Sequence, residues 1–381
     1  MSLIDVAIVG AGPVGATLAA RAAREGLRVE LFEARTGLSS DGRTLALSHA
    51  SRECLEEAGA WPAADATPIL SIHVSQRGGP GRTVIEAGEQ GLPALGYTVP
   101  FARLEAALAG RLGAIGIPIH YGHSCESISL AQDAATLRFA GGGEARARLL
   151  VLADGGANAG KIPGIAFQEK DYGQHAVVGA VRTDKPHAGR AYERFTPRGP
   201  MALLPVGERY ALVWTATPEE AASLKAMAPD EFLAQLQARF GDRAGRFVSV
   251  ESRASFPLKL RAVNTPVALR TAIIGNAAQA LHPIAGQGLN LGLRDAAVLA
   301  ASIASTPGEE LGGAAMLSAY RDARHRDASR GVVFTDLLVS LFGDGRRIPT
   351  WGRGLALAAL DLFPPARRLL AQRMIHGAPT S

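Results

Sequence analysis

The chain has 381 residues, of which 47% are hydrophobic and 20% are charged, a composition that is ordinary for a globular protein. Its two cysteines, Cys54 and Cys125, are too few for a disulfide framework, so we expect a reducing compartment. The formal net charge of +5 is concentrated after residue 320, where arginines outnumber acidic residues by ten to five. These arginines are not interleaved with a base-stacking surface, so we expect no nucleic-acid partner.

The N-terminal stretch MSLIDVAIVG has no basic leader before its apolar run, so it predicts a strand rather than a signal peptide. The sequence contains no uninterrupted run of about 18 apolar residues, so it predicts no membrane-spanning helix. No spacing of His and Cys fits zinc, and no G-x-S-x-G motif indicates hydrolysis. We therefore expect a cytoplasmic protein without a metal site.

The stretch DVAIVGAGPVGATLAARAAREGLRVELFEA predicts a complete βαβ unit. A buried strand over residues 5–9 runs into Gly10, Gly12 and Gly15, which have the G-x-G-x-x-G spacing, and after the helix a second strand ends on Glu33. Gly10 allows the tight turn, Gly12 lets a pyrophosphate approach the backbone, and Gly15 permits close packing of helix on strand. Because Glu33 can accept hydrogen bonds from ribose hydroxyls, the unit predicts a dinucleotide site that disfavours a 2′-phosphate.

Between Glu33 and Asp154 the pattern of apolar and polar residues changes several times. A polar loop is predicted at 37–42. Further along the chain, apolar residues alternate on both sides of a Gly-Gly-Pro-Gly turn, a pattern typical of a β-hairpin. The predicted elements are a helix over 44–59, the hairpin over 69–87, a helix over 101–112, strands at 117–121, 124–130 and 135–139, and the buried strand of ARLLVLADGG.

From residue 167 to 258 β alternation dominates, interrupted by one amphipathic helix over 229–240. The stretch RTAIIGNAA predicts another buried strand, and the chain from 290 onward is mostly helical. These patterns of buried strands, helices and alternating β segments predict an α/β, Rossmann-like domain. It is interrupted twice by segments of an α+β lobe with a mixed β-sheet. The predicted limits are 1–67, 98–165 and 263–340 for the dinucleotide-binding domain, 68–97 and 166–262 for the second domain, and 341–381 for a C-terminal helical region.

Three glycine-bearing turns follow buried strands, at 10–15, 154–156 and 275–288. Ligands of an open parallel sheet bind beyond the carboxyl ends of its strands, so these turns are predicted to line one extended dinucleotide. NAD seldom needs a third anchor this far along a chain, whereas FAD must also have its isoalloxazine ring fixed beside a substrate. The pattern therefore favours FAD.

The segments GAGPVGATLA, LADGG and GNAAQALHPIAGQGLNLGLRD resemble those of the class A flavoprotein aromatic hydroxylases, the 4-hydroxybenzoate hydroxylase fold group. With KDYGQHAVVGAV, AYERFTPRGPMALLP and RASFPL, the chain looks most like the ubiquinone-biosynthesis hydroxylases, and NAAQALHP is similar to the branch acting on 2-polyprenyl-6-methoxyphenol. The resemblance covers nearly the whole chain. It implies an FAD-binding domain with an inserted mixed β-sheet substrate domain and C-terminal helices.

The resemblance also implies which residues bind FAD. Asp154 and Gly155 match the family's DG motif, which serves FAD and NAD(P)H together, but Asn158 and Lys161 stand where Ser and Arg usually follow. Asn276 stands at the ribityl-binding position, where most relatives have Asp. The implied set is Gly10, Gly12, Gly15, Glu33, Arg43, Arg103, Asp154, Gly155, Asn276, Pro283, Gly286, Gln287, Gly288, Leu289 and Asn290.

The reaction that the resemblance implies is aromatic hydroxylation, in which NAD(P)H reduces FAD and O₂ then forms a flavin C4a-hydroperoxide that attacks a lipophilic phenol. Helix amides around residues 288–290 would stabilise negative charge on the reduced flavin. We expect His282, Pro283 and Tyr172 beside the chemistry.

A phenol reacts better as its phenolate, but no residue is self-evident as the base. Besides Tyr172 and His282, the candidates are Tyr97, His175 and Arg194. Glu193 is adjacent to Arg194, so we expect these two side chains to pair within the second domain rather than contact substrate.

Two other functions are compatible with the sequence. The chain could hydroxylate a soluble aromatic or secondary metabolite, or it could be a non-catalytic FAD-binding scaffold whose reduction is impaired by the altered DG motif. The arginine-rich C-terminal region carries apolar helical stripes, which could contact the inner membrane peripherally, other ubiquinone-biosynthesis proteins, or a second copy in a homodimer.

Overall fold

Parallel strands with buried apolar side chains form the centre of the first sheet of the computed structural model, which describes residues 2–77, 82–280 and 287–325. The strand order is β17-β18-β11-β1-β2-β8, and β10 and β9 extend the sheet beside β11. β1 is parallel to both β2 and β11, so the carboxyl ends of these three strands meet at one edge. The bounds are β1 Ile4–Val9, β2 Val29–Glu33, β8 Ile119–Tyr121, β9 Cys125–Leu130, β10 Ala135–Phe139, β11 Glu144–Leu152, β17 Val267–Ala268 and β18 Thr271–Ile273.

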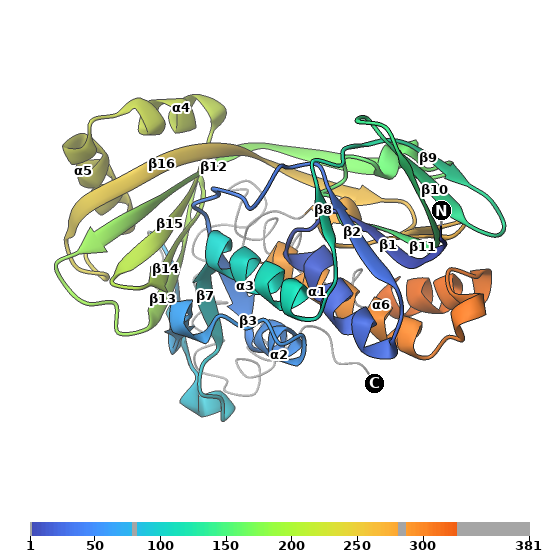
Figure 1. Cartoon of the computed structure of the whole chain (residues 1–381). Coiled ribbons are helices and arrows are strands. Elements are labelled where there is room, and N and C mark those ends of the chain that lie inside the picture. The colour runs from blue at the N-terminus through green and yellow to red at the C-terminus, as the bar shows by residue number, and fades with distance from the viewer. Residues whose placement is uncertain (1, 78–81, 281–286, 326–381) are drawn as a thin grey trace.

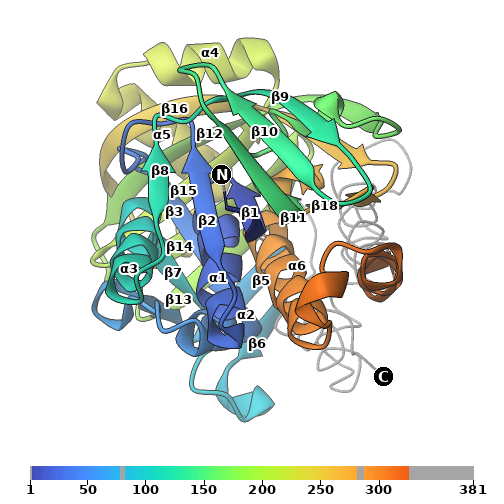
Figure 2. The same cartoon turned by 45° about the vertical axis from the view of Figure 1, so that its right-hand side comes forward.

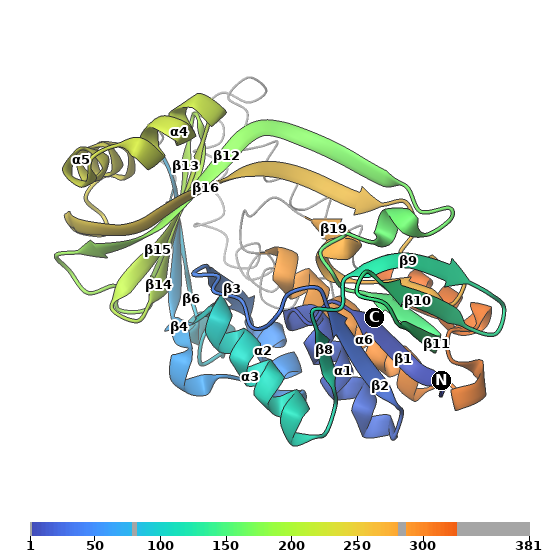
Figure 3. The ribbon, with the colours of Figure 1, turned by 45° about the horizontal axis from the view of Figure 1, so that its top comes forward.

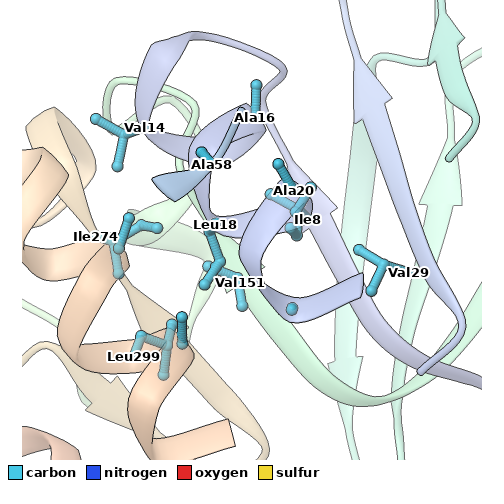
Figure 4. Packing of buried hydrophobic residues seen from close by; sticks show 14 of the residues in the cluster. Ile8, Val14, Ala16, Leu18, Ala20, Val29, Ala58, Val151, Ile274 and Leu299 are labelled. Carbon is cyan, nitrogen blue, oxygen red and sulfur yellow. The ribbon is translucent and has the colours of Figure 1, made fainter. Parts of the chain in front are cut away.

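Helices pack on one face of this sheet and form the largest apolar cluster (Figures 1 and 2). Figure 4 shows Leu18 of α1 (Pro13–Ala22) and Leu299 of α6 (Gln287–Ala304) beside Val151 of β11 and Ile274. All four side chains are fully buried. α2 (His49–Glu57) and α3 (Phe101–Ala114) contribute further buried residues. This packing fixes α1 and α6 relative to the strand ends.

Local signals define the limits of α1. Gly12 is its N-cap with φ −68°, and Pro13 occupies the first turn, where the missing N–H costs nothing. After α1, a short 3₁₀ turn ends at Gly26, which has φ 69°. The predicted βαβ unit is therefore confirmed.

The second sheet is mixed and has the order β19-β16-β12-β15-β14-β13-β5-β6. β5 is parallel to β13, and the other pairs are antiparallel. α4 (Pro218–Ala226) and α5 (Pro229–Phe240) cover one face, and Figure 3 shows the other face turned toward the first sheet and its helices. The bounds are β5 Ser71–Gln76, β6 Arg82–Glu86, β12 Phe167–Thr183, β13 Arg190–Thr196, β14 Gly199–Val206, β15 Arg209–Ala216, β16 Phe247–Val263 and β19 Gln279–Ala280.

A third, three-stranded sheet corrects the predicted helix over 44–59. β3 (Thr44–Ser48) is a strand, and it pairs with β7 (Gly96–Pro100), which also pairs with β4 (Thr67–Ile69). The helix begins only at His49, because the Ser48 side chain caps it by accepting the Ser51 N–H. The helical prediction was wrong over the first five residues because the pairing partner of β3 lies far along the chain.

Two more differences concern the second half of the chain. A second helix, α4, precedes α5; its Thr217 cap, Pro218 and acidic first turn were a recognisable start signal. Gln279 and Ala280 form β19 and pair with β16, so this segment joins the second sheet. Residues 314–325 are helical, and the region 341–381 lies outside the described residues. No described helix combines the length and apolar character that crossing a bilayer requires. The limits of the domains remain a prediction.

Candidate cofactor-binding site

A cavity of about 690 Å³ lies where the carboxyl ends of β1, β2 and β11 meet the start of α6. All three glycine-bearing turns contribute to its wall, as expected from the sequence. β3 and the loop before it close one side. Its lining includes Gly10, Gly12, Glu33, Arg35, Arg43, Thr44, Leu45, Ala46, Phe101, His123, Asp154, Gly155, Asn158, Lys161, Asn276, Ala280, Gly288 and Leu289.

The first turn is shaped by backbone contacts that leave no room for side chains at two positions. Gly10 has φ 103°, and a Cβ there would lie 2.6 Å from the carbonyl oxygen of Ala153. A Cβ on Gly15 would lie 2.2 Å from the carbonyl oxygen of Gly10. In contrast, nothing lies within 4 Å of a Cβ placed on Gly12, which faces the cavity. Gly15 therefore supports the turn, whereas Gly12 leaves open space at the N-terminus of α1 for an anion.

Glu33 ends β2 inside the cavity and is only 7% exposed. The Ala11 N–H donates to its Oε2 at 2.9 Å, and Arg35 donates to its Oε1 through Nε at 3.0 Å. Burial opposes the charge on the carboxylate, but the hydrogen bonds from Arg35 and Ala11 hold the pKa of Glu33 below its ordinary value. The side chain is therefore an ionised acceptor, as binding of ribose hydroxyls requires.

Arg35 and Glu105 are candidate site residues that the motif does not identify. The Arg35 guanidinium joins Glu33 to Glu105, with Nη1 2.7 Å from Glu105 Oε1. Glu105 lies on α3, is 2% exposed, and accepts the Ser39 N–H at 2.6 Å. These bonds tie the loop after β2 to α3 along one wall of the cavity. Arg35 could have been identified from the sequence because it lies two residues after Glu33, but nothing close to Glu105 in the sequence indicates its contact with Arg35.

The DG turn is closed by its own side chains. Asp154 accepts the Gly156 N–H at 2.9 Å, and it also accepts both the N–H and the side-chain amide of Asn158, at 3.0 and 2.6 Å. Lys161 donates to the carbonyl oxygen of Cys125 at 2.8 Å. The two departures from the family pattern therefore have local structural partners, and both side chains border the cavity.

At the other end of the cavity, Asn276 and Gly288 approach each other. A Cβ on Gly288 would lie 3.8 Å from Asn276 Oδ1, and Leu289 completes this wall. Asn290 has a different position: its Oδ1 accepts the Ser48 N–H at 2.8 Å and the Ser51 hydroxyl at 2.7 Å. Asn290 is buried and holds β3 against α6 rather than lining the cavity.

The remaining predicted cofactor contacts are only partly brought to the cavity. Arg43 lines it, with its guanidinium 5.6 Å from the Phe101 ring centroid and its Nε bonded to Asp41 at 2.7 Å. Arg103 is 66% exposed, lies 3.3 Å from Asp65, and is not part of the lining. α6 begins at Gln287, and Pro283 and Gly286 lie outside the described residues.

The candidates for the base lie apart from one another. Tyr172 is on β12, with the Lys170 ammonium 5.1 Å from its ring centroid. The hydroxyl of buried Tyr97 accepts from Arg52 at 2.7 Å, and His175 bonds Ser255 at 3.1 Å. None of these side chains lines the cavity, and His282 lies outside the described residues. The contacts of Tyr97 and His175 leave each with a structural partner.

The contribution of Glu33 to stability is expected to depend on pH. Because its folded pKa lies below the ordinary 4.5, its stabilisation is complete above about pH 4.5 and is lost as the pH falls through the folded pKa. A Glu33→Gln variant is therefore expected to unfold more easily than the wild type at about pH 7, with the difference shrinking below about pH 4. Urea unfolding at several pH values measures this, with exposed Glu25→Gln as the control. A difference between wild type and Glu33→Gln that is independent of pH contradicts the assignment.

The architecture around this cavity is that of FAD-dependent monooxygenases of the 4-hydroxybenzoate hydroxylase type. The structure of p-nitrophenol 4-monooxygenase PnpA from Pseudomonas putida superimposes with a TM-score of 0.81 over 100% of both chains, at 18% identity. Klebsiella pneumoniae HpxO complexed with FAD and uric acid gives a TM-score of 0.79 over 99% of this chain and 98% of that chain, at 18% identity. At these identities the likeness establishes the fold, and it confirms the predicted fold class.

Sequence comparison then gives the family. The model of the FAD binding domain family matches residues 3–335. The ubiquinone hydroxylase UbiL of Rhodospirillum rubrum is 35% identical over 377 residues, covering 96% of this chain and 88% of the relative. The 3-demethoxyubiquinol 3-hydroxylase of Escherichia coli is 32% identical over 305 residues, covering 76% of this chain and 77% of the relative. The chain belongs to the FAD binding domain family and is an FAD-dependent monooxygenase, which confirms the expected resemblance.

Proposed function

We propose that this chain hydroxylates the aromatic ring of a polyprenylated phenol in ubiquinone biosynthesis, with FAD as cofactor and NAD(P)H and O₂ as co-substrates. The observation that supports this most strongly is the single cavity shared by Gly12, Glu33, Asp154 and Asn276. It occurs in a chain that is 35% identical to a ubiquinone hydroxylase over nearly its whole length.

The residues around the cavity fit FAD. The open space at Gly12 and the free amides of α1 suit a pyrophosphate, and the ionised Glu33 suits the adenosine ribose. Asn276 can both accept from and donate to a ribityl hydroxyl. Bound FAD, when reduced by NAD(P)H, supplies the activation of O₂ that ring hydroxylation needs. The amides at the start of α6, near Gly288, would stabilise negative charge on a reduced flavin ring held beside them.

The proposed FAD contacts follow from these positions. Gly15 supports the first turn, and Asn290 positions β3. Arg103, His282, Pro283, Gly286 and Tyr172 remain proposals that rest on the resemblance alone, as do a peripheral contact with the inner membrane and a homodimer. The contacts supported by the lining of the cavity are Gly10, Gly12, Glu33, Arg35, Arg43, Asp154, Gly155, Asn276, Gly288 and Leu289.

The quinone profile of a strain that lacks this chain tests the proposal. We expect ubiquinone to be lost and a prenylated intermediate lacking one ring oxygen to accumulate, because the proposed reaction installs that oxygen. Mass spectrometry of lipid extracts measures both, and a plasmid carrying the wild-type chain is the control. Purified protein should oxidise NADH or NADPH when the phenol is added.

The outcomes separate the alternatives. Normal ubiquinone in the deletion strain, together with rapid NAD(P)H oxidation by the purified protein, would favour a hydroxylase of a soluble aromatic instead. A yellow protein that neither nicotinamide bleaches would favour the scaffold.

A further inference from the structure

The second sheet carries a carboxylate side chain, that of Glu193, which does not line the cofactor cavity. It lies in the middle of β13, opposite Val74 of β5 on one side and Ala202 of β14 on the other. One strand further, Val213 of β15 lies opposite Ala202. Aliphatic side chains therefore surround the carboxyl group on its own face of the sheet. Within the described residues it forms no hydrogen bond or ion pair, which corrects the expected pairing with Arg194.

The alternation of β13 explains why the pairing with Arg194 fails. Tyr192 and Arg194 point to the face that α4 and α5 cover, where Tyr192 packs against Phe240 and Arg194 approaches the Ser75 hydroxyl at 3.4 Å. Successive side chains of a strand point to opposite faces, so Glu193 lies on the other one. Adjacent positions in sequence are thus separated by the sheet itself.

The face that carries Glu193 is turned toward the cofactor site. Figure 3 shows α4 and α5 outside the sheet and β3 and α2 on the inner side. Ile72 and Ile85 lie on the Glu193 face and pack against Leu95, which immediately precedes β7. β7 is hydrogen-bonded to β3, and Thr44–Ala46 of β3 line the cofactor cavity. A substrate held between the second sheet and the cofactor would therefore contact the Glu193 face.

Two further polar groups on this face have no hydrogen-bond partner among the described residues. Gln76 is two residues beyond Val74 on β5, and Thr83 of β6 pairs with Val74, so both share the face of Glu193. Gln76 Oε1 and Thr83 Oγ1 are buried, and the described part of the chain provides neither with a hydrogen bond. Buried polar atoms are normally satisfied, so these two oxygens, beside the half-buried Glu193 carboxyl on an otherwise aliphatic surface, indicate a ligand that is mostly apolar and carries polar substituents.

We propose that Glu193 is the base that accepts the proton of the phenolic hydroxyl when the ring substrate is bound, an inference that rests on the proposed function. The substrate O–H bond breaks, an O–H bond to the Glu193 carboxylate forms, and the electron pair stays on the phenolate oxygen. The resulting phenolate makes the ring electron-rich, as hydroxylation requires, and bound reduced FAD with O₂ would supply the activated oxygen. The proton returns to solvent after the product leaves.

The surroundings of Glu193 suit this task. Glu193 is half-buried beside aliphatic side chains, and the resulting desolvation of its charged form raises its pKa to about 8. A general base works best when its pKa lies near the operating pH, since it must be ionised yet basic enough to hold the proton. Below about pH 8 the carboxyl is mostly protonated and cannot accept, so the rate of hydroxylation should rise with pH through this value.

The test uses the FAD-loaded full chain with 2-geranyl-6-methoxyphenol as the probe. Glu193→Gln should lower kcat for ring hydroxylation by about 100-fold with little change in KM, and it should abolish the rise of rate with pH. Glu193→Asp should keep that rise at a reduced rate. Exposed Glu208→Gln, on the turn between β14 and β15 of the same sheet, is the matched control and should behave as the wild type.

Folding and FAD content of each variant are checked by thermal unfolding and by the flavin spectrum, and both should match the wild type. A Glu193→Gln variant that hydroxylates at the wild-type rate and with the wild-type pH profile overturns the role of Glu193 and leaves the proposed function intact. A wild-type enzyme that yields no hydroxylated product from the prenylated phenol instead overturns the proposed function, and this inference with it.

Discussion

Replacing Asp295 by Ala is expected to destabilise the protein by about 3–5 kcal/mol and to weaken FAD binding. Asp295 of α6 pairs with Arg324 of the helix at 314–325, and both side chains are 3% exposed. Its second oxygen accepts the Gly275 N–H at 2.8 Å, directly before Asn276. The substitution removes the carboxylate that compensates the buried Arg324 charge, and it releases the turn that places Asn276 in the cavity. Urea unfolding of the apoprotein and a titration with FAD measure the two effects.

A second substitution separates these effects. In the double variant Asp295→Ala with Arg324→Met, both charges of the buried ion pair are removed, so most of the lost stability should return. FAD affinity should stay low, because Gly275 still lacks its acceptor. Asp322→Ala is the matched control: its ion pair with Arg321 on the same helix is exposed, and surface pairs contribute about 0–1 kcal/mol. A double variant that regains full FAD affinity would show that Asp295 does not position the turn.

The parts of the site that were predictable from sequence are those whose chemistry is local. Strand, glycines, helix and acid follow one another within one βαβ unit, so Gly12 and Glu33 were predicted and both border the cavity. Arg35 follows Glu33 closely, but Glu105 joins it only because α3 folds back against the loop that follows β2. Asn290 was predicted to face the cofactor, yet it bonds the Ser48 backbone, 242 positions away in sequence. Contacts of that range leave no periodic or motif signal.

The strand β3 illustrates the same limit for the fold. The sequence of β3 predicts the start of a helix, because no neighbouring segment of the sequence indicates the strand with which β3 pairs. Pairing with β7 turns Thr44–Ala46 into a wall of the cavity. Glu193 shows how sequence adjacency misleads: next to Arg194 it suggests an ion pair, but the two side chains lie on opposite faces of β13. The sequence alone therefore favours tyrosines, histidines and Arg194 as candidates for the base, and structural partners account for Tyr97 and His175.

Gly15→Ala and Gly12→Ala are expected to differ in their effect on the stability of the apoprotein, although both alter the same glycine turn and both should weaken FAD binding. A Cβ on Gly15 lies 2.2 Å from the carbonyl oxygen of Gly10 and 3.2 Å from Ala153 Cβ and Ile8 Cγ2. The nearest atom is backbone, so α1 must move away from β1. We expect Gly15→Ala to destabilise the apoprotein by about 1–3 kcal/mol and to reduce FAD binding as well.

Gly12→Ala should instead leave the apoprotein stable, because nothing lies within 4 Å of its Cβ and its φ of −68° suits alanine. The added methyl group enters the cavity at the N-terminus of α1, where the pyrophosphate must approach the backbone, so FAD affinity should fall by at least about 10-fold. Thermal unfolding without FAD, combined with FAD titration of both variants, distinguishes the two roles. A Gly12→Ala protein that binds FAD as the wild type does would mean that the pyrophosphate lies elsewhere in the cavity. The supporting role of Gly15 would then still account for the spacing of the glycines, but Gly12 would no longer mark the anion site.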